Sequence, residues 1–277
     1  MRPRLPNRYN RGMADDLREH LGHYAHGREH VRLADGRGIL ERDRTKSLVS
    51  RVLPPPPATV YDVGGGPGVY ARWLADLGYD VTLVDKYALH VEQAAAEASR
   101  GAAFTALEGD ARSLPAEDRS ADVVLLLGPL YHLIERAERL AALAEARRVL
   151  RPGGVLVAAA ISRHASLLES VFLGRLEDPA CQRVVDRAVA TGHHEPQIKD
   201  GFTRAYFHRV EELRDEVLAA GFGDADLFGV EGPACWLPEL IERRAQPAPW
   251  MFEAAELCER DPLMIGMSAH LLALARR

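Results

Sequence analysis

The chain has 277 residues, of which 47% are hydrophobic and 27% charged, and a formal net charge of −5. This length is enough to bury a full core, which favours one domain with additions. The negative charge gives no basic face for binding a nucleic-acid duplex, and the sequence shows neither an apolar run long enough to span a bilayer nor a signal-peptide core. Composition therefore predicts a globular, cytoplasmic protein without nucleic-acid or membrane partners.

The first part of the chain differs from the rest. Residues 1–12 are rich in Arg and Pro, and Met13 follows directly, so a translation start at Met13 is an alternative to Met1. The clearest boundary is LPPPPATVYDV, where four prolines impose an extended lead-in to a strand. We expect a helical N-terminal extension or lid over residues 1–53 and a core over residues 54–277.

After the prolines, apolar strands alternate with helical segments. Strands are predicted at 59–63, 80–85, 103–107, 121–127 and 155–161, and helices at 67–77, 89–100 and 133–149. Nearly continuous apolar strands such as DVVLLLG indicate burial on both faces, which is typical of a parallel sheet covered by helices. The pattern predicts an α/β, Rossmann-like fold.

Two further stretches interrupt this alternation. Residues 162–206 are predicted to hold two helices, at 165–176 and 180–191, and residues 232–267 form the second interruption. Between and after them we expect a helix at 210–220, a strand at 224–230 and a last strand at 268–277. Both interruptions are predicted to be cap insertions over the core.

The first predicted strand leads directly into a glycine-rich turn. The stretch that spans both, VYDVGGGPG, contains Asp62, Gly64, Gly65, Gly66 and Gly68. Glycine tolerates a tight turn and leaves room for a ligand to approach the backbone. In an open parallel sheet, ligands bind beyond the carboxyl ends of the strands, where strand order reverses. This loop is therefore predicted to bind a cofactor.

Two acids follow the next two strands. Asp85 ends the second strand, where a carboxylate accepts hydrogen bonds from a ribose diol, and Asp110 follows the third. GPGVYA also satisfies G-x-G-x-x-A, so an NAD(P)-type dinucleotide is an alternative. A pyrophosphate beside Asp62 is unfavourable, and a dinucleotide gives Asp110 no role, so the acids favour a sulfonium nucleoside.

Together these segments resemble the class I S-adenosylmethionine-dependent methyltransferases. The motifs are VYDVGGGPG, VTLVD, LEGDARSLP, ADVVLLLGPLYHL and RRVLRPGGVLVAAA. The resemblance covers residues 59–161 strongly and 207–231 with 268–276 weakly. It implies a seven-stranded, mostly parallel sheet with an antiparallel last strand, and S-adenosylmethionine as cofactor.

The resemblance also implies roles for individual residues. Asp62 and the loop glycines Gly64, Gly65, Gly66 and Gly68 would approach the methionine part of the cofactor. Asp85 with Lys86 would contact the ribose, and Asp110 with Ala111 the adenine. The backbone of Leu127 and Gly128 would lie under the cofactor, and Tyr24 with Arg32 would close over it.

The fourth strand ends in GPLYH, which bears on the acceptor. Gly128 cannot hydrogen-bond an exocyclic amine, and no carboxylate is present there for a Mg²⁺-dependent catechol site. His132 is the best candidate for a general base, with helix packing as the alternative. Tyr131 is a candidate for orienting the acceptor, with a half-buried structural ring as the alternative. His208 is a candidate for facing the pocket, with a place at the start of a helix as the alternative.

Metal ligation is not expected. The three cysteines are isolated along the chain, which favours free thiols over a three-thiolate site for a soft ion: Cys181, Cys235 and Cys258. In GHHEP, His193 and His194 point apart in an extended loop, and no further ligand has suitable spacing.

The expected helical cap favours a small acceptor, because a protein or duplex needs an open face. The sequence thus predicts methyl transfer to an O, N or C atom of a small-molecule metabolite by a monomer or homodimer. Two alternatives stay open: an NAD(P)-binding oxidoreductase, and a non-catalytic cofactor-binding or scaffold protein of the same fold.

Overall fold

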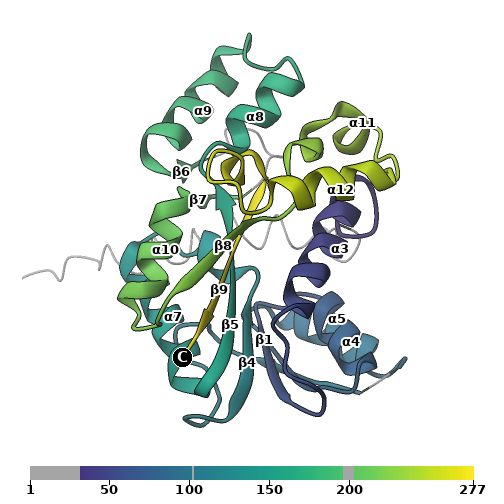
Figure 1. The fold of residues 1–277 in the computed structure, drawn as a ribbon, viewed down its shortest axis with the longest axis vertical. Coiled ribbons are helices and arrows are strands. Elements are labelled where there is room, and N and C mark those ends of the chain that lie inside the picture. Colours follow the sequence, from purple (N-terminus) through teal and green to yellow (C-terminus); the bar gives the residue numbers. More distant parts are fainter. Residues whose placement is uncertain (1–31, 102, 196–202) are drawn as a thin grey trace, which may run out of the picture.

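The computed structural model describes residues 32–101, 103–195 and 203–277. Tyr24 and most of the predicted N-terminal lid lie outside these residues. Figure 1 shows a central sheet with helices on both sides and a group of helices beyond its upper end. The described helices include none that is long and apolar enough to cross a membrane.

Seven strands form the main sheet of the described chain, in the order β3-β2-β1-β4-β5-β9-β8. Their bounds are β1 Thr59–Val63, β2 Asp80–Asp85, β3 Thr105–Glu108, β4 Ala121–Leu126, β5 Leu150–Ser162, β8 Ala225–Gly229 and β9 His270–Arg276. The first five run parallel, and β9 is antiparallel to both β5 and β8. The predicted Rossmann-like fold with its antiparallel last strand is confirmed.

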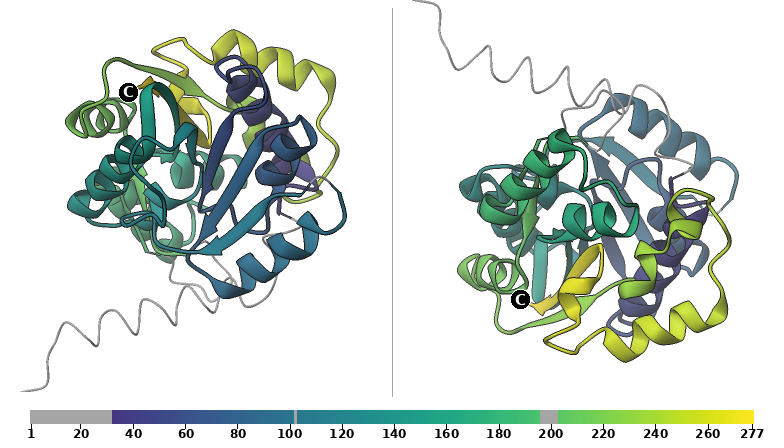
Figure 2. Two further views of the ribbon diagram at one scale, coloured as in Figure 1. Left: turned by 90° about the horizontal axis from the view of Figure 1, so that it is seen from below. Right: turned by 90° about the horizontal axis from the view of Figure 1, so that it is seen from above.

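Helices cover both faces of the sheet because its central strands are apolar on both sides. One face packs against α7 (Arg136–Val149) and α10 (Val210–Ala219). The other packs against α3 (Gly36–Ser50), α4 (Val69–Asp76) and α5 (Ala88–Ala98). Figure 2 shows the sheet between these two layers. Strand order reverses between β1 and β4, where an α/β fold of this kind binds its ligand.

The two interruptions contain the remaining elements. Residues 162–206 hold α8 (Ala165–Phe172), α9 (Pro179–Thr191) and the short strands β6 (His193–His194) and β7 (Ala205–His208). Residues 232–267 hold η1 (Pro233–Trp236), α11 (Pro238–Ile241), α12 (Pro249–Cys258) and η2 (Ile265–Met267). In Figure 1, α8, α9, α11 and α12 gather at the upper end of the sheet, where β5 ends. We call these two stretches the cap segments.

A third apolar cluster joins the cap segments to the carboxyl edge of the sheet. It combines Leu40 of α3, Ile161 of β5, Phe207 of β7, Trp236 of η1 and Met251 of α12. The last two residues of β5, Ile161 and Ser162, also pair with β7. Apolar side chains from α3 and both cap segments therefore pack against the carboxyl end of β5.

Ion pairs connect α3 to both cap segments. Arg37 of α3 bonds Glu169 of α8 at 2.9 Å. Arg44 is 1% exposed; it bonds Glu256 of α12 at 3.1 Å, and it also bonds Glu259 and the Val230 carbonyl. A buried guanidinium without such partners would be costly, so these contacts fix α3 against α12.

Several element boundaries differ from the predictions, including that of β5, which begins at Leu150 and not at 155. The helix predicted at 133–149 begins at Arg136 as α7, and an additional short helix, α6 (Pro129–His132), precedes it and ends where the chain becomes extended at Leu133. The third strand begins at Thr105, two residues later than predicted. The helix predicted at 165–176 ends at Phe172, just before Gly174, which has a left-handed backbone with φ of 64°.

Candidate active site

The glycine-rich loop is a tight connection between β1 and α4. Gly64, Gly66 and Gly68 have φ values of 68°, 55° and 94°, a region that side chains disfavour. A Cβ on Gly64 would lie 2.7 Å from the Pro129 ring, and one on Gly65 would lie 2.6 Å from the Asp62 carboxylate. Neighbouring protein groups therefore exclude side chains at these positions, even before any ligand binds above the loop.

Asp62 is a buried acid beneath this loop. It is 0% exposed, and neither carboxylate oxygen has a hydrogen bond of good geometry to any described residue. Burial, together with the nearby charge of Asp85, raises the pKa of Asp62 to about 7, although the Ala71 N–H acts in the opposite direction. A carboxylate with unused acceptor capacity at this point favours a cationic or hydrogen-bond-donating ligand.

Asp85 lies at the carboxyl end of β2, as predicted, and it organises the loop. One oxygen accepts a hydrogen bond from the Gly66 N–H at 2.9 Å, and the other accepts from the Tyr87 N–H at 2.9 Å. His90 Nδ1 lies 3.1 Å from that second oxygen. A carboxylate has about four acceptor positions, so Asp85 retains about one for a ribose hydroxyl. Lys86 beside it is exposed.

Asp110 follows β3 at the same edge. Arg112 forms two parallel bonds to its carboxylate, at 2.9 and 2.6 Å, and these bonds lower the pKa of Asp110. The side chain is thus already engaged, while Ala111 next to it is half-buried. An adenine at this place would meet the Asp110–Ala111 backbone and one side of an ion pair.

The end of β4 packs directly against the glycine-rich loop. A Cβ on Gly128 would lie 3.1 Å from the Gly64 carbonyl, so this position is restricted to a very small residue. Tyr131 is buried within the third apolar cluster, and its ring centroid lies 4.7 Å from that of His132, which is half-buried. Leu127 and Gly128 are half-buried at the switch point, where the resemblance places them.

His208 belongs to a buried polar group behind this segment. It is 0% exposed, and its Nε2 lies 3.2 Å from Glu216 of α10. Arg139 of α7 forms a forked pair with Glu216 and also bonds the carbonyls of Leu133 and Ile134. Burial lowers the pKa of His208, so it is neutral near pH 7. This arrangement fixes the chain just after His132; a catalytic role of His208 stays a prediction.

The other predicted side chains that the structure describes contact neighbouring protein groups or are free thiols. His194 stacks on Phe207 with ring centroids 4.7 Å apart, and burial lowers its pKa to about 4. The three cysteines are free thiols. Arg32 lies at the start of the described chain and bonds Glu41 at 2.6 Å.

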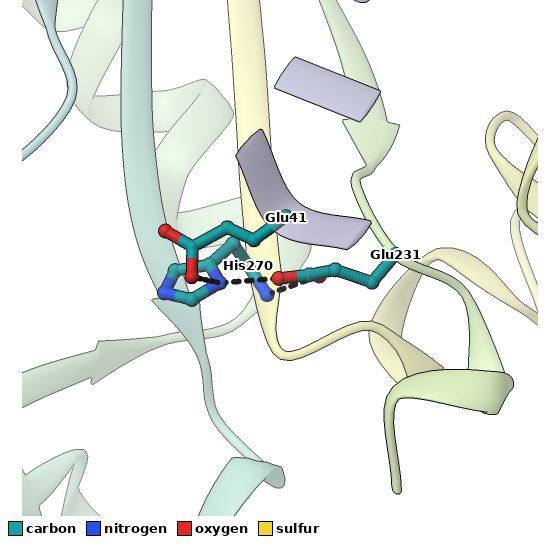
Figure 3. A group of neighbouring side chains, drawn as sticks. All are labelled: Glu41, Glu231 and His270. Atoms are coloured by element: carbon teal, nitrogen blue, oxygen red, sulfur yellow. Dashed lines mark hydrogen bonds and ion pairs between the residues drawn. The ribbon is translucent and has the colours of Figure 1, made fainter. Parts of the chain in front are cut away.

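Sequence reasoning missed one cluster, which Figure 3 shows: Glu41, Glu231 and His270. Glu41 lies on α3, Glu231 follows β8, and His270 begins β9. Their ligand atoms lie within 4.8 Å of one another. The three residues are 39 or more positions apart, so no local spacing in the sequence reveals them. Sequence reasoning also missed His90. Its position five residues after Asp85 was the one signal that could have revealed it.

Comparisons with known proteins place this geometry in a family. Residues 60–154 match a family described as a methyltransferase domain. The uncharacterized methyltransferase YodH of Bacillus subtilis is 31% identical over 114 residues, which cover 41% of this chain and 47% of that protein. The ubiquinone biosynthesis O-methyltransferase of Cereibacter sphaeroides is 27% identical over 201 residues, or 70% of this chain and 72% of that protein.

The solved structures agree on the fold. A SAM-dependent methyltransferase from Thermotoga maritima superimposes with a TM-score of 0.58 at 20% identity, over 92% of this chain and 97% of that one. Residues 60–154 thus match the methyltransferase-domain family, and the chain as a whole has the fold of the S-adenosylmethionine-dependent methyltransferases, for which S-adenosylmethionine is the methyl donor. The chain spans about half the length of YodH, the first curated relative.

The described residues fit this cofactor. Asp62 offers a buried carboxylate whose oxygens form no hydrogen bond of good geometry with the described residues, which suits the ammonium group of the methionine part. The glycine-rich loop presents bare backbone above it, and Asp85 retains about one acceptor position for the ribose. Roles for individual residues stay predictions.

The raised pKa of Asp62 predicts that cofactor binding is coupled to proton release. The free protein holds a proton on Asp62 below about pH 7, and a bound ammonium group would favour the ionised form. Affinity for S-adenosylmethionine should therefore rise from about pH 6 to about pH 7.5, with release of up to about one proton. Calorimetry in buffers of different ionisation enthalpy measures this release. Asp62→Asn should abolish it, and a buffer-independent heat in the wild type would contradict the assignment.

Proposed function

We propose that this protein transfers a methyl group from S-adenosylmethionine to an O, N or C atom of a small-molecule metabolite. The observation that carries the proposal is the third apolar cluster, which packs cap residues against Ile161 at the end of β5 and Tyr131 after β4. An apolar cover beside the cofactor would exclude water and suit a small acceptor, whereas a duplex or a folded protein needs an open face.

The chain's own residues would hold the two reactants in line. When bound, the cofactor supplies an electrophilic methyl group on a sulfonium. Asp62 would orient the ammonium group, Asp85 the ribose, and the Asp110–Ala111 backbone the adenine. The Leu127–Gly128 backbone would define the lower wall, because Gly128 has no side chain between it and Gly64. Positioning of this kind supplies most of the rate in a direct displacement.

Tyr131 and His132 are the proposed acceptor-side residues of α6. They follow β4 at the switch point, and Arg139 fixes the chain immediately after them through the Leu133 and Ile134 carbonyls. Their roles are orientation of the acceptor for Tyr131 and proton acceptance for His132. The O-methyltransferase similarity favours a metabolite as acceptor, since that relative acts in ubiquinone biosynthesis by its name.

A non-catalytic cofactor-binding protein is the alternative from another class. It shares the cofactor site and predicts binding without turnover. The buried, apolar cover over the carboxyl edge favours the enzyme, because a binding protein gains nothing from excluding water beside the methyl group.

Incubation with methyl-labelled S-adenosylmethionine and a metabolite extract of the host tests the proposal. We expect label in at least one small-molecule fraction, detected by mass as an added CH₂. Heat-denatured protein is the control for spontaneous methylation. Cofactor binding by calorimetry without any labelled product would support the non-catalytic alternative instead.

A further inference from the structure

The cluster of Glu41, Glu231 and His270 lies at the same edge of the sheet as the cofactor residues. His270 pairs with Ile161, next to the last residue of β5, and β5 adjoins β4. At the usual strand spacing, β9 is about 10 Å from β4. The neighbours of His270 on its face of β9, Leu272 and Leu274, pack in the same core as α4. His270 is therefore on the acceptor side of the edge, on the face that carries α4.

Glu231 holds His270 through both carboxylate oxygens. One oxygen accepts a hydrogen bond from the His270 backbone N–H at 3.0 Å, and the other lies 2.5 Å from Nδ1. Glu231 is 0% exposed, so it cannot turn to solvent. Figure 3 shows that Nε2 lies on the side of the ring away from Glu231. The imidazole is thus fixed in orientation, with Nδ1 as its proton donor to Glu231.

The second nitrogen is available for chemistry. Among the described residues, no group hydrogen-bonds Nε2 of His270, and the side chain keeps 16% of its surface exposed. A ring held at Nδ1 by a buried carboxylate and accessible at Nε2 is the arrangement of a general base. The described chain contains another His–carboxylate pair in His208–Glu216, but there the imidazole is fully buried.

The distances favour a proton over a metal ion in this cluster. Two ligands of one tetrahedral zinc, each at about 2.1 Å, lie about 3.4 Å apart. Nδ1 and the Glu231 oxygen are 2.5 Å apart, as in a strong hydrogen bond. Glu41 is also occupied, since Arg32 bonds it at 2.6 Å. Arg32 and a protonated His270 balance the two carboxylates without an added cation.

We infer that His270, in place of His132, is the general base of the methyl transfer and that the acceptor is a hydroxyl group. The inference rests on the proposed function. His270 is not among the candidate residues of the sequence analysis. A neutral hydroxyl suits this cluster because the carboxylates of Glu41 and Glu231 disfavour an anionic acceptor. An imidazole accepts a hydroxyl proton readily only as the oxygen bonds to carbon.

The step is balanced in atoms and charge. The acceptor oxygen forms a bond to the methyl carbon, and the carbon–sulfur bond breaks with its electron pair remaining on sulfur. The hydroxyl proton moves to Nε2 of His270, and the resulting imidazolium is stabilised by Glu231 at Nδ1. Product release returns the proton to water.

The cluster also determines the pH at which the base works. Burial disfavours the imidazolium, but the charges of Glu41 and Glu231 outweigh burial and raise the pKa of His270, while Arg32 opposes them. Arg37 on α3 acts on Glu41 and Glu231 as well. A raised pKa means that His270 becomes neutral, and therefore active, only above the ordinary range of histidine.

Chemical modification tests the geometry without any acceptor. Diethyl pyrocarbonate acylates accessible, neutral imidazoles, and peptide mass spectrometry locates the product. We expect His270 to react at Nε2, with a pH midpoint that moves lower in Glu231→Gln because the neighbouring charge is removed. Half-exposed His193 serves as the internal control. An unreactive His270 under conditions that modify His193 would overturn the inference.

Label transfer to the active metabolite fraction tests the catalytic role. His270→Gln should slow single-turnover transfer by about 100-fold or more, with cofactor affinity within about threefold of wild type. Glu231→Gln should shift the pH profile to lower pH, and His193→Gln should leave the rate unchanged. Equal rates for wild type and His270→Gln, a methyl product on carbon, or a loss of rate on adding a chelator would each overturn the inference. Wild-type protein that transfers no label would refute the proposed function itself.

Discussion

Glu216→Ala is expected to destabilise the fold by about 3–5 kcal/mol, the cost of leaving a buried charge without its partner. Arg139 is 1% exposed and forms three bonds to Glu216 through two of its nitrogens. The guanidinium also lies 3.8 Å over the Tyr206 ring, so it has no route to solvent. Urea unfolding at neutral pH measures the loss.

The matched control is Glu211→Ala, an exposed glutamate on the same helix, for which we expect a change below about 0.5 kcal/mol. The double variant Arg139→Met with Glu216→Met should lose less than Glu216→Ala alone, because it removes both charges. Similar losses for Glu211→Ala and Glu216→Ala would mean that the buried pair contributes nothing beyond helix packing.

Acid unfolding gives the same prediction a second measurement. Burial by itself would raise the pKa of Glu216, but hydrogen bonds from His208 and Arg139 lower it to about 2. A carboxyl with a lowered pKa in the folded state stabilises the fold above its ordinary value. That contribution is lost as the pH falls from about 4.5 to about 2. Glu216→Ala should flatten this part of the acid profile.

Asp85→Ala should weaken S-adenosylmethionine binding by about 1.5–3 kcal/mol, or about 10- to 150-fold, through loss of charge-assisted hydrogen bonds. The structure adds a second reason. Asp85 also holds the Gly66 N–H at 2.9 Å, so the variant loosens the loop that carries the cofactor. Calorimetric titration measures the affinity. Thermal unfolding without ligand measures how much stability the loop loses when the Gly66 contact is removed.

Asp80→Ala provides the matched control, because Asp80 lies exposed at the opposite end of the same strand. Its affinity should equal that of the wild type. Asp85→Asn should give an intermediate loss, since an amide keeps one acceptor oxygen. Unchanged affinity in Asp85→Ala would show that the ribose does not bind at the end of β2.

The strands and the glycine-rich turn of the predicted cofactor site could be placed from the sequence because their signals are local. The strands at Thr59–Val63 and Asp80–Asp85 have the predicted bounds, since β-branched residues and flanking turns define both ends. Asp62, the glycines and Asp85 fall within one short unit, so a single motif contains the whole group. Proximity in sequence and proximity in space coincide there.

The acceptor side could not be predicted in the same way. His270, Glu231 and Glu41 come from three distant segments, and their contact depends on how β8, β9 and α3 pack. His208 looked accessible in the sequence, at the end of an insertion, but α10 brings Glu216 against it and buries it. Side-chain partners across packed elements carry no periodic or motif signal.

The ion pairs of α3 have a consequence for how such a protein changes its specificity. Arg44 and Arg37 connect one helix to α12 and α8, which belong to different insertions. A chimera that exchanges a single insertion with that of a homologue would remove the ion-pair partner of one of these arginines. If that arginine were Arg44, a buried guanidinium would be left unpaired. New acceptors should therefore arise through coordinated replacement of α3 and both insertions, while the nucleoside-binding half is inherited unaltered.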